Sequence, residues 1–349
     1  MKTPLWLRPF TSRPYPPREA VGVLWRNLVG PSFANPTGLA WGPQHLALND
    51  ITPALTLGFG GDVMSMFDKP LVVDEAVQAF FAACDHVVLN FEGVITDAPQ
   101  IAPDQKHTPR ILDDVQALAP AERLVLSLAN NHMGDYGEAA CQACMALLSQ
   151  RGFRHFGVRS SPIHDLHPMV RLITGTEWSN REGRHLAWLT EPGPLVKPGA
   201  LNIAFPHWGY ELEAYPRASL VERASQWLDA VDAIVAHHSH MPQPLQVVAP
   251  SAGSPGVKKL VAYSLGDLCF GLASDRPFFW PYQWGSVLRM TVGPLKAQPE
   301  RWAIGTADWR FVHCGPSADG QAQRLSLHDR CALTSLTPLK PRRAWAARA

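Results

Sequence analysis

The residues of this sequence that are best suited to chemistry stand at the ends of five apolar segments. They are Asp62, Glu92, Asn131, His132, His207, His238 and His240. Carboxylates, amide oxygens and neutral imidazoles together are typical ligands of hard or borderline divalent cations. No cysteine belongs to this set, which argues against a structural zinc site. The pattern therefore predicts a divalent-metal centre.

Three members of this set have structural alternatives. Asp62 follows Gly-Gly and would also serve as a helix cap. Glu92 precedes a glycine and would also suit a solvated loop end, and Asn131 would also hold a turn. We expect the two carboxylates to bind metal, and Asn131 to bind or support it.

The segment His-His-Ser-His, residues 237–240, is the least easily explained by packing. Three imidazoles within four residues rarely have a packing role, and we expect at least one of them to contact metal. In an extended segment His238 and His240 point the same way, so they would share a site. His237 is the weakest candidate of the three.

The elements that position these residues are buried strands. Apolar runs at residues 55–62, 86–93, 124–129, 201–207 and 233–240 lead directly into the polar side chains. Enzymes of the α/β class place their chemistry at the carboxyl edge of such strands. The first half alternates strands with expected helices at 74–83, 113–118 and 137–151, which implies parallel pairing. The second half is rich in strands, and two mixed sheets with helices outside satisfy both halves.

Composition excludes several classes of function. With 349 residues, 46% hydrophobic and 17% charged, the chain is expected to be globular, with one large α/β domain or one domain with appendages. A formal net charge of +1 gives no field that would attract nucleic acid or an anionic membrane. We see no signal peptide and no integral membrane span near the required length of about 20 apolar residues, so a cytoplasmic location is expected.

Cysteine usage adds one weak motif. Cys141 and Cys144 form a C-x-x-C pair without a second pair. We expect both to lie on a helix, partly in the core, and zinc or redox use is the alternative.

Six segments, in order, carry a resemblance to a known family. They read GGDVM, NFEG, SLANNHMGDYG, HWGYE, HHSH and YSLGDLCF, and they span roughly residues 55–271. This set resembles the CapA family of capsule and poly-γ-glutamate synthesis proteins, which have a metallophosphatase-like (calcineurin-like phosphoesterase) fold. The resemblance implies a four-layer α/β sandwich in which helices flank two mixed β-sheets. It would occupy residues 51–315, between an irregular N-terminal arm (1–50, with a short helix at 18–28) and a C-terminal tail (316–349).

The resemblance also implies roles for individual residues. Asp62 would bind one ion, Glu92 would take the bridging position, and the remaining metal ligands would be Asn131, His207, His238 and His240. His132 would face the substrate as general acid or charge stabiliser, with His240 as a second catalytic candidate, and Glu211 would orient His207. Three positions depart from the family pattern: Met64 replaces a histidine of the wider superfamily, Ala236 replaces a glycine before the histidine pair, and Asp267 replaces an asparagine.

These roles imply a hydrolase with one or two divalent ions, drawn from Mn, Zn, Fe or Ca. Such ions activate water and polarise a phosphoryl or acyl oxygen. Lys106 and Arg110 would hold an anionic small-molecule, peptide or polymer substrate, with a solvated loop as the alternative. Phosphoester and amide or γ-glutamyl bonds both suit these residues. Metal-assisted peptide epimerisation and a non-catalytic role in polyglutamate or capsule synthesis are the other hypotheses.

Overall fold

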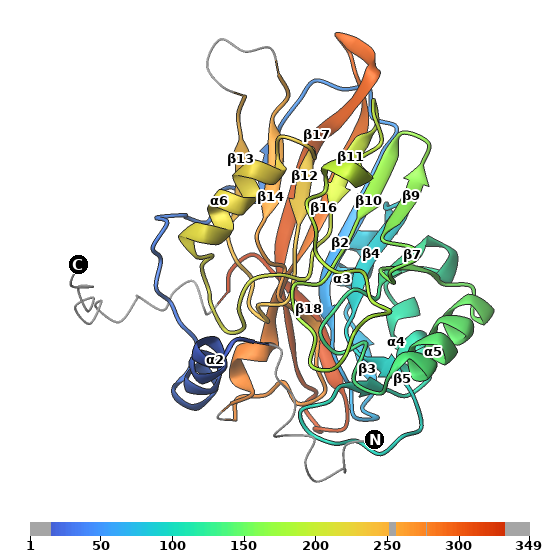
Figure 1. Cartoon of the computed structure of the whole chain (residues 1–349), viewed down its shortest axis with the longest axis vertical. Helices are drawn as coiled ribbons and strands as arrows, with labels where there is room; N and C mark the ends of the chain where they lie inside the picture. Colours follow the sequence, from blue (N-terminus) through green and yellow to red (C-terminus); the bar gives the residue numbers. More distant parts are fainter. Residues whose placement is uncertain (1–14, 251–255, 277, 332–349) are drawn as a thin grey trace.

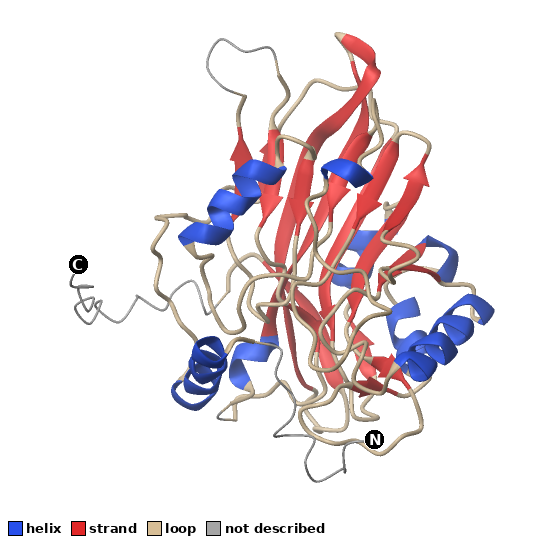
Figure 2. Cartoon of the chain, in the orientation of Figure 1, coloured by secondary structure: helices blue, strands red, loops and turns tan. Residues whose placement is uncertain are grey.

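The computed structural model describes residues 15–250, 256–276 and 278–331 (Figure 1). Two β-sheets extend along the long axis of the molecule and enclose an apolar cluster between them, and the helices lie outside them (Figure 2). The larger sheet has ten strands, and the second sheet has six. Both sheets mix parallel with antiparallel pairs.

The larger sheet is built around β2, which lies at its centre. Its main path is β3-β18-β17-β16-β2-β4-β7-β8, with β1 beside β17 and β15 beside β2. Its strands are β1 (His45–Ala47), β2 (Leu55–Val63), β3 (Leu71–Val73), β4 (His86–Phe91), β7 (Leu124–Ser127), β8 (Arg154–Phe156), β15 (Asp267–Cys269), β16 (Trp284–Leu295), β17 (Gln298–Pro316) and β18 (Gln323–His328). The strands β2, β4, β7 and β8 are parallel, as the alternation of strand and helix predicts.

The second sheet has the order β13-β14-β12-β11-β10-β9. Its strands are β9 (Ile163–His167), β10 (Val170–Ile173), β11 (Leu201–Ala204), β12 (Ala233–Val235), β13 (Leu245–Val248) and β14 (Lys259–Ala262). The helices are α2 (Pro17–Val29), α3 (Glu75–Ala82), α4 (Ile111–Gln116), α5 (Glu138–Gln150) and α6 (Ala218–Trp227). A short pair, β5 (Val94–Ile95) and β6 (Lys106–His107), lies in the loop after β4.

Three apolar clusters hold these layers together. The first lies between the larger sheet and helices α3, α4 and α5, where Phe81 and Leu148 pack on strand residues such as Leu126. The second fills the space between the sheets, and the third joins the second sheet to α6. The neighbouring strands β2 and β4, at the centre of the larger sheet, are buried on both faces. Their sequences are therefore largely continuous apolar runs. The expected fold class, an α/β sandwich of two mixed sheets flanked by helices, is confirmed.

Regular elements occur in both segments that the sequence predicted to be irregular, the N-terminal arm and the C-terminal tail. Residues 323–328, which fall in the expected C-terminal tail, form β18 and pair with β17 and β3. The arm before residue 51 contains α2, close to the expected helix at 18–28. Cys141 and Cys144 lie buried on α5, as expected for core residues, and burial raises the pKa of their thiols to about 12 and about 11. None of the helices in the described ranges is long and apolar enough to cross a membrane.

Candidate metal centre

Six of the expected ligands converge at the carboxyl edge of the strands. Asp62 is the last residue but one of β2, Glu92 directly follows β4, and His207 follows β11. His238 and His240 come from the segment after β12. The side chains of Asp62, Glu92, Asn131, His207, His238 and His240 are all buried, with at most 3% of their surface exposed. Buried groups of this kind need partners or an ion to offset their desolvation.

Close backbone contact fixes Asp62 in place. A Cβ on Gly61 would lie 1.8 Å from the carbonyl oxygen of Gly266, so only glycine lets β2 approach β15 this closely. The carboxylate of Asp62 accepts hydrogen bonds from Nδ2 of Asn90 (2.7 Å) and from the backbone N–H of His238 (3.0 Å). The carboxylate therefore joins β4 and the histidine segment at a single point.

The carboxylate of Glu92 is only partly satisfied. Its Oε2 accepts a hydrogen bond from Asn90 (3.2 Å), whereas its Oε1 has no hydrogen-bond partner within the described chain. The Nε2 atoms of His207 and His240 lie 3.9 Å from Oε1, and that of His132 lies 4.0 Å away. These distances are too long for hydrogen bonds, and they lie at the upper limit for two ligands of one ion, which stand about 4 Å apart when bonds of about 2 Å point in opposite directions. The orphaned oxygen and converging imidazoles fit a divalent cation.

Four groups of carboxylates and imidazoles have ligand atoms within 4.8 Å of one another. They are Asp62–His207–His237, Glu92–His207–His238, Glu211–His238–His240 and Asp62–Glu92–His240. Because most of these residues belong to two groups, the groups overlap and form one continuous cluster. Donors that mix carboxylate oxygen with imidazole nitrogen suit Zn, Mn and Fe.

His237, the weakest candidate by sequence, lies inside this cluster. Its Nδ1 is 3.3 Å from Oδ1 of Asp62 and 2.8 Å from Nδ1 of His207. Because two imidazole nitrogens at that distance share one proton, one ring donates and the other accepts. His237 therefore links Asp62 to His207.

The backbone of the histidine segment holds an uncommon conformation. His238 has φ 102° and His240 has φ 53°, both in the region that favours glycine. Residues held in this way cost about 1–3 kcal/mol each and cluster at functional sites. The two rings share a site, as expected, with their centroids 6.0 Å apart. The turn, rather than simple strand alternation, brings them together.

Burial and neighbouring charges shift the pKa values of the clustered side chains in different directions. Burial, and then the neighbouring charge of Asp62, raises the pKa of Glu92 well above its usual value. Burial alone would raise the pKa of Asp62, but the hydrogen bond and charge of His237 outweigh it and lower that pKa. Burial and neighbouring imidazoles lower the pKa of His207 and of His238. Neutral imidazoles are the form that binds metal.

His240 has the opposite behaviour. Its Nδ1 lies 2.8 Å from Oδ1 of Asp267. Burial lowers the pKa of His240, but the charges of Asp267 and Glu92 outweigh it and raise the pKa well above its usual value. A carboxylate behind an imidazole is a common arrangement for a metal-binding histidine, because it orients the ring and makes it a stronger ligand. Sequence reasoning noted Asp267 only as a departure from the family pattern.

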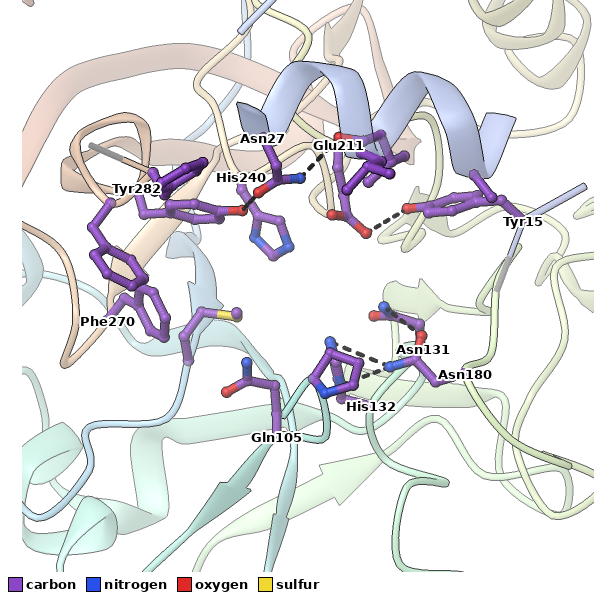
Figure 3. Close-up of a pocket in the computed structure, with 17 residues that line it drawn as sticks. Tyr15, Asn27, Gln105, Asn131, His132, Asn180, Glu211, His240, Phe270 and Tyr282 are labelled. Atoms are coloured by element: carbon purple, nitrogen blue, oxygen red, sulfur yellow. Dashed lines mark hydrogen bonds between the residues drawn. The ribbon is translucent and has the colours of Figure 1, made fainter. Parts of the chain in front are cut away.

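His132 lies at the edge of the cluster, next to a carboxylate of its own. Its Nδ1 donates to Oδ2 of Asp135 at 2.6 Å, and the amide of Asn180 lies 2.8 Å from the same nitrogen. Burial raises the pKa of Asp135. This contact leaves Nε2 of His132 directed toward Glu92 and the cavity beside it (Figure 3). Nε2 itself lies 3.5 Å from Nδ2 of Asn180, and an imidazole held in this way is suited to proton transfer.

Asn131 lies directly beside a histidine of the cluster. Its Oδ1 is 2.8 Å from Nε2 of His207, and its Nδ2 lies 3.3 Å from Oδ1 of Asn180. The neighbouring Asn130 donates to Oδ1 of Asn90 (3.2 Å) and accepts from the backbone N–H groups that follow it. Asn131 therefore faces the ligands, whereas Asn130 holds the loop.

Glu211 contacts residues other than those expected. Its Oε1 accepts a hydrogen bond of 2.7 Å from the hydroxyl of Tyr15, and it groups with His238 and His240. Within the described chain no hydrogen bond joins it to His207, so the expected orienting contact is absent. Tyr15, which belongs to the N-terminal arm, was missed by sequence reasoning because no local pattern marks it.

The two expected substrate-binding cations do not reach the cluster. Nζ of Lys106 donates a hydrogen bond to the carbonyl oxygen of Ala98 (2.6 Å), and Nε of Arg110 lies 3.9 Å from Asp114. Neither lines the cavity next to His132 and His240, to which the same loop contributes Pro103 and Gln105 instead. The loop was correctly placed near the site, but its charged residues turn away.

The fold and the cluster together define an α/β sandwich with a candidate divalent-metal centre at its strand ends. A family described as bacterial capsule synthesis protein PGA_cap matches residues 56–178 and 195–272. This match covers more than half of the chain, and the chain belongs to that family.

Individual relatives are distant. A probable polyglutamine synthesis accessory protein of Mycobacterium tuberculosis is 26% identical over 219 residues, which cover 53% of this chain and 56% of that protein. The PGA biosynthesis protein CapA of Bacillus subtilis is 24% identical over 250 residues, covering 62% of this chain and 63% of that protein. The matches thus span less than two thirds of either relative. The crystal structure of a hypothetical protein from Thermus thermophilus aligns with TM-score 0.39 at 12% identity, over 72% of this chain and 98% of that chain.

Proposed function

We propose that this chain is a divalent-metal-dependent hydrolase that acts on a phosphoester or an amide bond in capsule or poly-γ-glutamate metabolism. The observation that carries the proposal is the buried Oε1 of Glu92, which has no partner in the described chain while three imidazole Nε2 atoms stand 3.9–4.0 Å from it. A buried carboxylate oxygen without a donor is costly, and a cation at this point would offset that cost. Membership of the capsule synthesis family supports the metabolic context.

The proposed roles follow from the contacts. Asp62, Glu92, His207, His238 and His240 would hold one or two ions, and a divalent ion bound there would supply Lewis acidity and lower the pKa of water. Asn131, whose Oδ1 lies 2.8 Å from Nε2 of His207, would complete the set or support it. Glu92 would take the bridging position, because three imidazole nitrogens surround its Oε1.

His132 is the proposed proton donor. Hydrolysis breaks the bond from phosphorus or acyl carbon to the leaving group, the hydroxyl of water joins that atom, and the leaving group takes a proton. Asp135 holds Nδ1 of His132, so Nε2 would carry that proton toward the cavity. Proton transfer by a positioned side chain contributes roughly 10²–10⁴-fold to rate.

The test combines metal analysis with an activity screen. We expect stoichiometric Mn, Zn or Fe in the purified protein, and hydrolysis of a phosphomonoester, a phosphodiester or a γ-glutamyl peptide after addition of Mn²⁺. Asp62→Ala and His238→Ala should lose both metal and activity. His45→Ala, an exposed histidine on β1, is the matched control and should keep both. Absence of bound metal, together with unchanged function in Asp62→Ala, would contradict the proposal and favour a non-catalytic role.

A further inference from the structure

A cavity of about 470 Å³ opens beside the metal-ligand cluster. Asn131, His132 and His240 line it, so the cluster and the cavity share one wall (Figure 3). Gln105, Asn180 and Glu211 add further polar groups at that end. A molecule in this cavity would therefore present one of its bonds to the cluster.

One side of the cavity is apolar. It is formed by Met64, Phe270, Phe279 and Tyr282, which pack against one another in a cluster of their own. The rings of Phe270 and Tyr282 have their centroids 5.4 Å apart, and Figure 3 shows both on the side of the opening away from Asn131 and Asn180. Met64 stands where the wider superfamily has a histidine, so that position contributes a thioether to the apolar wall.

Helix α2 forms a second apolar wall. It is held through polar contacts: Arg26 is buried against Glu19 (2.7 Å) and Glu213 (3.2 Å), and Asn27 accepts a hydrogen bond of 3.1 Å from the hydroxyl of Tyr282. Ala20, Val23 and Leu24 line the cavity, and Leu24 remains 59% exposed. A helix that is held by its charged side chains while its apolar ones line an opening is ready to receive an apolar group.

The few charged side chains that line the cavity are consistent with an apolar ligand. The ionisable groups among its described lining residues are His132, His240 and Glu211, with the two phenols Tyr15 and Tyr282. None of the described lining residues is Lys or Arg. A polyanion would meet Glu211 there, whereas an apolar group would gain from the removal of its surface from water.

We propose that the substrate carries an uncharged apolar group, aryl or alkyl, next to the bond presented to the cluster. This group would lie between α2 and the wall of Met64, Phe270, Phe279 and Tyr282. The placement of the scissile bond rests on the proposed function, but binding of the apolar group does not require catalysis. A bare polyglutamate chain is the alternative that the experiment separates.

The experiment measures affinities by calorimetry in the full chain with Mn²⁺ present. Its ligands are methyl, butyl and octyl phosphate and a γ-linked triglutamate. We expect octyl phosphate to bind at least about tenfold tighter than methyl phosphate, because each buried methylene adds to affinity. We also expect the triglutamate to bind more weakly than butyl phosphate.

Two variants with a matched control locate the effect. Leu24→Gln and Phe279→Gln change partly exposed side chains of the two walls and should remove most of the chain-length dependence. Leu28→Gln also changes an exposed apolar residue of α2, but one that does not line the cavity, and it should behave like the wild type. Equal affinities for all three alkyl phosphates, or tightest binding of triglutamate, would overturn the inference.

A further variant separates this inference from the proposed function. In Asp62→Asn we expect weaker binding of every phosphate, while the ratio between octyl and methyl phosphate persists. If wild-type protein binds no metal but the ratio is still found, the hydrolase proposal fails and the apolar site stands. If no ligand binds at all, both are wrong.

Discussion

The hydroxyl oxygen of Tyr15 lies 2.6 Å from Nε2 of His238, although the two residues are 223 positions apart in the chain. The same hydroxyl donates to Oε1 of Glu211 at 2.7 Å, so its oxygen accepts the proton carried by Nε2. Nδ1 of His238 is buried and has no partner within the described residues. The contact therefore leaves Nδ1 as the nitrogen available to a metal ion. Residues that accept the second N–H of a ligating histidine orient it and increase its basicity.

Tyr15→Phe should therefore weaken metal binding. Loss of the hydroxyl leaves Nε2 of His238 without its acceptor, and loss of such a partner typically costs about 10–100-fold in metal affinity. Competition with a metal chelator, followed by Mn²⁺ or Zn²⁺ titration, measures the change. Tyr210→Phe, at a tyrosine that stacks under Arg217, is the control. An unchanged affinity in Tyr15→Phe would show that the contact does not position His238.

Glu92→Gln should separate stability from metal binding. The variant keeps the shape of the side chain but removes a buried charge whose Oε1 has no partner in the described chain. We expect the metal-free protein to become more stable by about 1–3 kcal/mol, because a buried carboxyl with an unsatisfied oxygen is costly and burial raises its pKa. The same variant should lose stoichiometric metal. Urea unfolding of the chelated wild type and variant tests the first outcome, and elemental analysis the second; a less stable variant would contradict the argument.

Much of this site could be predicted from the sequence, because buried parallel strands have continuous apolar sequences. In this chain, several of those apolar runs end in polar residues. Asp62, Glu92 and His207 were placed correctly at the strand edge for that reason. The contact of Tyr15 was not predictable, because it depends on how the arm folds back over the cluster. The sequence predicted that Lys106 lies on the loop after the second strand. The direction of the Lys106 side chain was not predictable, because it depends on a hydrogen bond to the carbonyl oxygen of Ala98.

Strand β18 shows that prediction of the fold from the sequence is limited in the same way. Its six residues, QRLSLH, carry a short alternation in a polar surrounding, and their pairing is decided by β17 and β3, which lie far from each other in sequence. Short strands with few apolar residues depend on tertiary context more than on their own propensity. The sequence alone therefore did not mark residues 323–328 as a strand.

Gly61→Ala should destabilise the protein strongly. A Cβ at this position would lie 1.8 Å from the carbonyl oxygen of Gly266, so β2 and β15 would have to separate. We expect a loss of at least about 3 kcal/mol, in the range of severe core overpacking. Gly193→Ala is the matched control, because a Cβ there meets nothing within 4 Å. Chemical denaturation of both variants gives the comparison, and equal stabilities would refute the close approach.

Acid should destabilise the protein through a group of histidines remote from the metal centre. Burial, and then the charge of Arg154, lowers the pKa of His86 and of His164, and burial lowers that of His155. The folded protein holds these rings neutral, whereas the unfolded chain protonates them below about pH 6.5. Their contribution to stability is therefore complete above that pH and is lost as the pH falls below it.

His164→Gln should reduce this pH dependence. Nε2 of His164 is buried without a partner in the described chain, so its replacement removes a titrating group and few contacts. The measurement is the urea midpoint at about pH 5.5 and about pH 7.5, on either side of the usual histidine pKa, and the difference should shrink in the variant. The imidazoles of the metal cluster contribute equally to both proteins and cancel in the comparison. His45→Gln, at an exposed ring beside Asp308, should keep the wild-type difference, and an equal difference in His164→Gln would show that this ring is not held neutral by the fold.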